Sequence, residues 1–256
     1  MSDPSTDIEK LDDAPQAAPR SKWAGRIRWF SAEFSVVVLG ILFAFSVNTW
    51  WGEVASDRRE AGYLQDLRLD FEENGFRLQD AIALADTIKT QTETLLSLEN
   101  AAQGRELGLD SLHYLVETLS FLPTFEPVTR TYDDILGAGE LQTLRDADLR
   151  ALLSDFHSQL LLVHTVQETQ ERQFVSLFLP YILENLDYAS IGNYPVGQDG
   201  LADEPSDVIY SVLGTRAFNN WLIMRLQWAD DLQAQHQGVL MTVKEIQLAL
   251  ASELGR

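Results

Sequence analysis

A run of apolar residues from Phe34 to Val47 constrains this chain more than any other feature. Ser35, Gly40 and Ser46 are the exceptions within it, and ten of its residues are Leu, Ile, Val or Phe. Each such residue favours insertion near a bilayer centre by roughly 0.3 to 0.6 kcal/mol, so the run contributes about 3 to 6 kcal/mol. The sequence therefore predicts a membrane-spanning helix.

Tryptophans lie at both ends of this run: Trp23 and Trp29 precede it, and Trp50 and Trp51 follow it. Tryptophan is enriched where a bilayer meets water, so these four are interpreted as interfacial anchors. From Trp29 to Trp51 a helix rising about 1.5 Å per residue is long enough to cross a hydrocarbon core of roughly 30 Å with little tilt.

The flanking charges predict how this helix is oriented. Arg20, Lys22, Arg26 and Arg28 are basic with no acid among them, whereas acids and bases nearly cancel over residues 53–60. Basic flanks stay on the cytoplasmic side. We expect a single-pass protein of the bacterial inner membrane, with a cytoplasmic N-terminus and a periplasmic C-terminal domain.

Two other interpretations of the run were weighed. Ala44-Phe45-Ser46 offers the small-x-small pattern of a cleaved secretory signal, but the region before the apolar run is longer than signal peptides normally have, and Trp50-Trp51 suits an interface. A buried core helix suits a shorter apolar run. An uncleaved anchor is therefore favoured.

Composition divides the chain into three parts: a disordered acidic cytoplasmic tail (1–19), the basic flank with the transmembrane helix (20–52), and an extracytoplasmic helical bundle (53–256). A net charge of -20 makes nucleic acid and anionic lipid poor partners for the bulk of the molecule. The absence of cysteine excludes disulfides, thiol catalysis and cysteine-ligated metals.

Beyond the anchor, small or apolar residues recur in alternating steps of three and four, the spacing of one face of a helix. This pattern predicts an amphipathic, coiled-coil-like helix of about forty residues. Its expected seam consists of Leu64, Leu67, Phe71, Asn74, Leu78, Ala81, Ala85, Ile88, Thr92 and Leu95.

Shorter helices are expected next. Asp110 and Ser111 are suitable caps for a helix to about Phe121, Tyr132 to Leu136 predicts one or two turns, and another short helix follows the glycine turn at 137–139.

Two more long helices complete the prediction. Asp146 is a typical helix cap, and Pro180 should kink or interrupt the helix after it. The last helix is expected from near Ser206 to about Leu254. The expected buried stripes are Leu149, Leu152, Leu153, Phe156, Leu160, Val163, Phe174 and Leu177 in the first, and Phe218, Trp221, Leu222, Leu232, Val239, Val243, Ile246 and Leu250 in the second.

The expected fold is all-α: an N-terminal transmembrane helix followed by an antiparallel, up-down-up-down bundle of about four long helices. No segment shows the short alternating runs of a sheet.

Within the anchor, Glu33, Gly40, Ala44 and Asn48 fall in an arc of roughly 80° at 100° per residue. Small residues let membrane helices approach closely, so this arc is a candidate helix-packing face. The alternative is that Glu33 and Asn48 merely lie at the two interfaces. Ion translocation is disfavoured, because a single helix offers no pathway unless it oligomerises.

The other candidate constellations have simpler explanations. His157 and His164 share a face with Glu168, but two histidines at this spacing are more often core or boundary residues than metal ligands. The acids around the glycine turn lack calcium-loop spacing and predict a solvated face. These acids are Asp133, Asp134, Glu140, Asp146 and Asp148. No catalytic motif is present, and we predict no catalytic residue, cofactor or metal.

Residues 32–53 contain a recognisable pattern: Ala32-Glu33, Val36 to Leu42, Ala44, Asn48-Thr49-Trp50 and Glu53. This pattern resembles a bacterial single-pass membrane protein family, domain of unknown function six-zero-nine-zero. The resemblance continues weakly through Tyr63-Leu64, Asp66-Leu67, Asn74, Tyr132 to Ile135 and Gly139-Glu140-Leu141. It implies an anchored protein with a helical extracytoplasmic domain, and implies no activity.

Together these features predict a membrane-anchored, non-catalytic helical module for protein–protein interaction in the cell envelope. Its expected partners are the lipid bilayer and either a second copy or another envelope protein, with no nucleic acid. The alternative is a small-molecule binder or enzyme with a pocket near residues 180–207, where Tyr181, Tyr188 and Tyr194 accompany several glycines.

Overall fold

The computed structural model describes residues 22–191 and 206–255, with side chains from Phe34 onward apart from Ser35 and Val36. All regular structure in these ranges is helical, with no strand, which confirms the all-α prediction. The chain divides into two compact units, Met1–Ala55 and Ser56–Arg256. Each unit is described by itself.

Helix α1 (Lys22–Leu96) contributes to both units. In the second unit every residue of the predicted seam from Leu64 to Leu95 is buried, so this prediction is confirmed. The seam keeps a strict seven-residue repeat, the pattern by which helices pack side by side in coiled coils.

Two short helices follow, α2 (Ala101–Leu107) and α3 (Leu109–Thr118). The Asn100 side chain caps α2 by accepting two backbone hydrogen bonds. The prediction that Asp110 or Ser111 caps α3 is wrong: the N-cap is Gly108, whose φ of 93° suits a glycine between two helices. Asp110 instead lies in the first turn of α3, where an acid complements the helix dipole.

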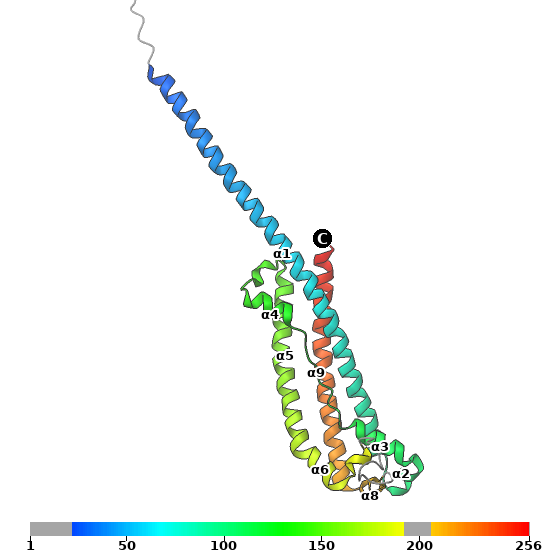
Figure 1. Cartoon of the computed structure of the whole chain (residues 1–256). Coiled ribbons are helices and arrows are strands. Elements are labelled where there is room, and N and C mark those ends of the chain that lie inside the picture. Colours follow the sequence, from blue (N-terminus) through cyan, green and yellow to red (C-terminus); the bar gives the residue numbers. More distant parts are fainter. Residues whose placement is uncertain (1–21, 192–205, 256) are drawn as a thin grey trace, which may run out of the picture. The chain divides into compact units, whose positions relative to one another are not determined.

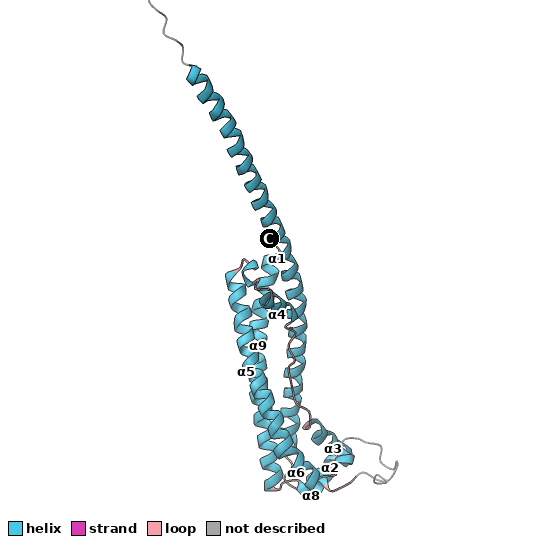
Figure 2. Cartoon of the chain, turned by 60° about the vertical axis from the view of Figure 1, so that its left-hand side comes forward, coloured by secondary structure: helices cyan, strands magenta, loops and turns pink. Residues whose placement is uncertain are grey.

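Residues 119–129, here called the strap, connect α3 to α4 (Arg130–Gly137) without forming a helix. Figure 2 shows the strap as a continuous loop beside α1. After α4, a 3-10 turn, η1 (Leu141–Thr143), leads to α5 (Ala147–Gln173). The Asp146 side chain accepts the backbone N–H groups of Asp148 and Leu149, so its predicted role as a cap is confirmed.

A π-helical turn, η2 (Phe174–Phe178), separates α5 from α6 (Leu179–Asn185) and explains one wrong assignment. The turn inserts one extra residue into the helical repeat just before Pro180. Phe178 therefore occupies the core position predicted for Leu177, and Leu177 is exposed. A short helix, α7 (Tyr188–Ile191), ends this part of the chain.

The C-terminal region comprises α8 (Ile209–Val212) and the long α9 (Arg216–Leu254). Gly214 separates them with a φ of 73°, and a Cβ there would collide with the backbone oxygen of Glu99. All eight residues predicted to face inward from α9 are buried.

The second unit is a bundle of three long helices, α1, α5 and α9, rather than about four. Figures 1 and 2 both show these helices side by side. The middle of α1 lies beside the start of α5, because Glu60 pairs with Arg145, just before α5 begins. Lys89, near the end of α1, pairs with Asp230 in the first half of α9. Thus α1 and α5 are parallel and α9 is antiparallel to both. The strap returns the chain from α3 to α4 without a long helix, so three long helices form the described bundle.

The core of this unit consists of two hydrophobic clusters. One gathers Phe71, Leu78, Phe156 and Val243, where α1, α5 and α9 run together. The other joins the far ends of the long helices to α3, α6 and α8 through residues such as Ile88, Leu112, Phe178, Ile209 and Trp221. Stacked and tilted aromatic pairs around Phe178 and Trp221 fill the second cluster.

Candidate functional site

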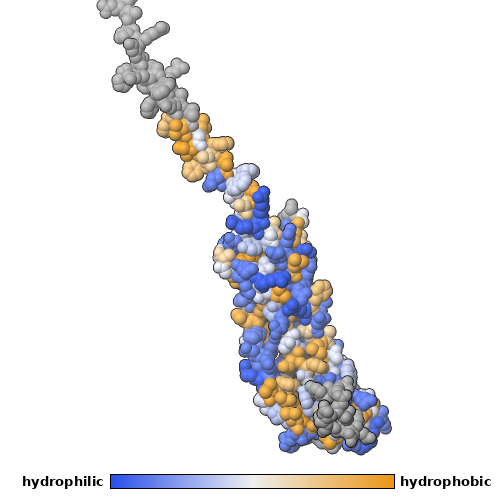
Figure 3. All heavy atoms as spheres, viewed as in Figure 1, coloured by the Kyte–Doolittle hydropathy of each residue, from blue (hydrophilic) through white to orange (hydrophobic). Residues whose placement is uncertain are grey.

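The segment of α1 from Val37 to Trp51, here called the apolar segment, exposes its large side chains on every side. Those with large exposed areas are Val37, Leu39, Ile41, Leu42, Phe43, Phe45, Val47, Trp50 and Trp51. At 100° per residue they surround the whole helix. Figure 3 shows hydrophobic residues along the visible side of this segment. A helix that is apolar all round needs an apolar environment.

The part of α1 that contains this segment, Val37–Leu96, is long and apolar enough by length and composition to cross a membrane, and its apolar window, with a mean hydropathy of 1.4, is 0% buried. The rings of Trp50 and Trp51 lie edge to face with centroids 6.0 Å apart at the end of the apolar segment. Helix α1 is the one such helix among the described residues, and signal sequences share this composition.

The predicted packing arc is exposed as far as it is described. Ala44 and Asn48 are exposed, and a Cβ added at Gly40 would meet nothing within 4 Å. The side chain of Glu33 lies outside the described residues. So do the side chains of Trp23, Trp29, Lys22, Arg26 and Arg28, whose backbones are helical, and the whole of Arg20.

In the bundle, buried polar side chains hold the backbone of the strap. Asn74 donates from Nδ2 to the carbonyl of Val128 at 2.9 Å and accepts from its N–H at 2.7 Å. Gln167 of α5 accepts from the N–H of Phe125 at 2.8 Å and donates to its carbonyl at 3.4 Å. These paired bonds replace those that a helix would have supplied to this segment.

The end of the strap is held by an ionic cluster. Asp70, buried on α1, accepts from the N–H and the hydroxyl of Thr131 at 3.1 and 2.6 Å. Its other oxygen pairs with the Arg130 guanidinium at 2.7 Å. A carboxylate with these partners is compensated for the loss of water, so Asp70 fixes where α4 begins.

The beginning of the strap is held by Arg225, a fully buried residue of α9. Its Nε donates to the carbonyl of Leu119 at 2.8 Å, and Nη2 donates to that of Phe121. These carbonyls follow the C-terminal end of α3, where the helix dipole is negative and favours a cation. Burial lowers the pKa of Arg225 to about 10.

His236 of α9 is also fully buried, beside the middle of the strap. Its Nε2 lies 3.3 Å from Oε1 of Gln167, and its ring contacts Phe125 edge to face. Burial lowers the pKa of His236 to about 4, so the ring is neutral near pH 7.

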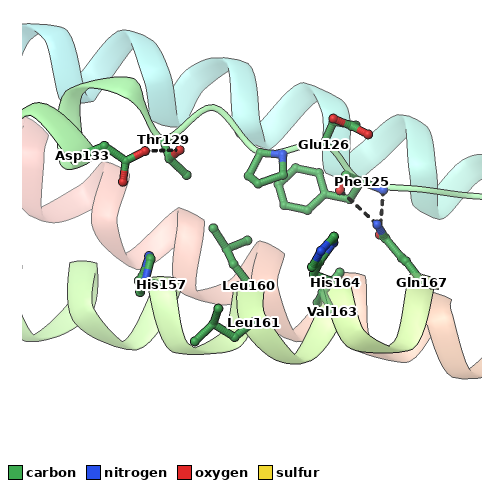
Figure 4. A pocket seen from close by; sticks show the side chains of 11 residues that line it. Phe125, Glu126, Thr129, Asp133, His157, Leu160, Leu161, Val163, His164 and Gln167 are labelled. Atoms are coloured by element: carbon green, nitrogen blue, oxygen red, sulfur yellow. Dashed lines mark hydrogen bonds between the residues drawn. The ribbon is translucent and has the colours of Figure 1, made fainter. Parts of the chain in front are cut away.

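The strap and α5 enclose a groove of about 310 Å³. Figure 4 shows His157, Leu160 and His164 rising from α5 toward the strap, where Phe125 lies. The groove is apolar in its middle, with an imidazole toward each end. This arrangement offers shape and hydrogen bonding to a partner.

The histidines considered as metal ligands are not brought together. His164 is largely exposed and lies 3.1 Å from Glu168, whereas the ring of His157 packs against Tyr132. His113 bonds to the carbonyl of Ser206 at 3.1 Å. Over residues 34–191 and 206–255, three metal-ligating side chains nowhere cluster closely enough to suggest an ion site.

Some carboxylates of the predicted acidic face form hydrogen bonds with neighbouring side chains, and others are exposed. Glu140 accepts a hydrogen bond from the hydroxyl of Tyr63 at 2.7 Å, which together with burial raises the pKa of that tyrosine. Asp133 accepts from Thr129 at 2.7 Å, while Asp134 and Asp148 are exposed.

The polar residues that hold the strap were not identified from the sequence as a group. The available signal was their place in the heptad seams: Asn74, Gln167, Arg225 and His236 all fall where an apolar residue is expected. A polar residue in a seam needs a partner, and the strap supplies it. The alternative pocket near residues 180–207 falls largely on residues 192–205, including Tyr194, which lie outside the described residues.

Comparisons of the chain with protein-family models, with curated proteins and with solved structures found no match in any of the three. The candidate sites therefore have to be interpreted from their own residues.

Proposed function

We propose that this protein is a single-pass, membrane-anchored and non-catalytic helical module that binds other proteins in the bacterial envelope. The observation that carries the proposal is the apolar segment, Val37–Trp51, whose side chains are exposed around the full circumference of the helix. Exposing that apolar surface to water costs free energy, whereas the hydrocarbon core of a bilayer is an apolar environment that suits it.

The proposed orientation has the N-terminus in the cytoplasm and the bundle in the periplasm, attached to the inner membrane. It is supported by the four basic residues at 20–28 against the nearly balanced charges at 53–60. The resemblance of residues 32–53 to the membrane protein family of unknown function belongs to the same proposal.

The non-catalytic part of the proposal is supported by the role of the polar groups between the helices and the strap. Asn74, Gln167 and Arg225 form hydrogen bonds with the backbone of the strap. These bonds maintain the architecture of the bundle. A bundle held in this way can present a binding surface for other proteins on the outside of its helices.

The test is membrane extraction combined with protease accessibility. In cells expressing the full chain, alkaline carbonate should leave the protein in the membrane pellet. Protease added to spheroplasts should digest the bundle while sparing an N-terminal fragment that includes the apolar segment, because that fragment is shielded by lipid.

Two results would contradict the proposal. Release by carbonate would show that the apolar segment does not span the bilayer. A soluble product beginning at Val47 would establish the cleaved signal instead. A control protease digestion after detergent lysis should remove the N-terminal fragment as well.

A further inference from the structure

The middle of the bundle carries a surface without charge. From residue 156 to 167 on α5 and from 232 to 243 on α9 there is no Asp, Glu, Lys or Arg, although charged residues make up 23% of the chain. The two stretches face each other, since Gln159 bonds to Thr242 at 2.9 Å. We call them together the neutral belt.

Apolar side chains project from this belt. Leu162 and Met241 are 60% and 63% exposed, and both line a groove of about 410 Å³ between α5 and α9. Gly238 also lines the groove, and a Cβ added there would meet nothing within 4 Å. The belt therefore contains both projecting side chains and a depression that can receive them.

A second groove lies on the other side of α5, between α5 and the strap. Leu161, which is 61% exposed, lines it on the α5 side, Glu126 and Asp133 line its opposite side, and Val163 lines both grooves. The neutral part of α5 is thus a ridge with a groove on each flank. Ridges that enter grooves are the usual way in which two helices pack.

We propose that the neutral belt is the contact between two copies of this chain. The net charge of -20 makes copies repel one another through most of their surface, and the repulsion is least where neither carries charge. A basic partner would find only Glu245 as a charged side chain in the α5–α9 groove. The belt of a second copy is complementary to this surface. Its apolar side chains can enter the groove here, and its groove can receive the apolar side chains that project from here.

Such a contact is self-complementary, as the interface of a two-fold dimer must be. The inference rests on the proposed membrane anchoring in one respect: anchored copies share one membrane, which raises their effective concentration and permits a modest interface to be occupied.

The test exploits the absence of cysteine from the chain. In membranes containing the full-length protein, Leu162→Cys treated with a short bismaleimide should give a crosslinked dimer. Leu183→Cys, on α6 and 59% exposed, is the matched control outside the belt and should crosslink far less. Equal yields from the two variants would overturn the proposal, as would a product whose mass shows a different protein.

A second pair of variants separates docking from folding. Gly238→Lys places a charge in the groove without a clash and with better helix propensity than glycine, so the bundle should fold while the Leu162→Cys crosslink is lost. Gln227→Lys adds the same charge at an exposed residue of α9 outside the belt and should leave the crosslink intact. Equal crosslinking in the two backgrounds would contradict docking through the groove.

Salt distinguishes a second copy from a partner held by ion pairs. Raising the salt concentration screens repulsion between two acidic copies, so the yield of dimer should rise. A fall would indicate ion pairing and overturn the proposal. Carbonate extraction of the same membranes reports on anchoring independently, so failure of the belt is distinguishable from failure of the proposed function.

Discussion

Two segments of helix α1 differ in how their apolar residues are distributed. From Val37 to Trp51 apolar side chains surround the helix, and none is buried within the protein. From Leu64 to Leu95 most of them form one buried stripe of seven-residue periodicity, while Leu69 and Phe76 are exposed among the charged residues of the other faces. The secondary structure is the same, so the distribution alone decides what each segment needs as its surroundings.

The stripe also accommodates buried polar residues, one of which is a carboxylate, whereas the apolar segment contains no charged residue. Asp70, Asn74 and Thr92 are buried in or beside the stripe, each with hydrogen bonds that compensate for lost water. A protein interior supplies such partners from neighbouring segments, whereas lipid supplies none. The contrast between the two segments therefore extends to which substitutions each will accept.

The largest expected effect is on the stability of the bundle. Leu78→Ala should lower its free energy of unfolding by about 2 to 5 kcal/mol, because it leaves a cavity in the packed core. Leu42→Ala, the same change in the apolar segment, should leave that free energy unchanged. Urea unfolding of the full chain in detergent, followed by helical circular dichroism, measures both.

The contrast between the two segments is contradicted if both substitutions lower the free energy of unfolding equally. Equal losses would mean that Leu42 packs against the bundle, and the apolar segment would then be part of the same core. No loss from Leu78→Ala would mean that the seam does not hold the helices together.

The buried seams of α1 and α9 could be predicted because burial follows the helical period. The apolar residues from Leu64 to Leu95 and from Phe218 to Leu250 are spaced with that period. The strap was not predictable in the same way. The sequence also contains Pro123 and Pro127, which are typical of a break in helix. They do not predict that the broken segment packs against the long helices along its whole length. The path of the strap depends on hydrogen bonds from Asn74, Gln167 and Arg225 to its backbone. These residues are distant in the sequence and come together only when the helices pack.

The position of Phe178 shows a second limit. Continuing the period of α5 predicts Leu177 as the buried residue, and one inserted residue in a π turn shifts the register to Phe178. Pro180 marked the place of the irregularity without specifying its form. The anchor arc is different again: Gly40, Ala44 and Asn48 are open to a partner, and their role stays a prediction.

The next expected effect concerns pH and also belongs to the bundle alone. The folded-state pKa of His236, about 4, lies below its ordinary value of 6.5, so the unfolded chain binds the proton more readily between these values. The contribution of neutral His236 to the free energy of unfolding should be complete above pH 6.5. It should be lost as the pH decreases toward 4, by up to about 3 kcal/mol.

His236→Gln should reduce this acid dependence, measured as the change in urea midpoint between pH 7 and pH 4. Carboxylates titrate in both proteins, so the difference between their two profiles isolates the histidine. Identical profiles would show that the ring is not buried in a neutral form beside Gln167 and Phe125. The apolar segment has no titratable side chain between Val37 and Trp51, so its insertion should not change over this range.

The smallest expected effect lies in the apolar segment and concerns association. Glu33, Gly40, Ala44 and Asn48 share one side of the helix, and a small residue at 40 lets a second helix approach closely. Gly40→Leu should weaken association in the bilayer by about 1 to 2 kcal/mol, the size of such contacts in model systems. Insertion should survive, because leucine is more hydrophobic than glycine, and no neighbour of Gly40 obstructs the new side chain. Leu42→Ala, on the opposite side, is the matched control and should leave association nearly unchanged. Crosslinking yield in membranes compares the two. Equal effects would mean that the arc is no different from the rest of the circumference, and the apolar segment would then contribute attachment without choosing a partner.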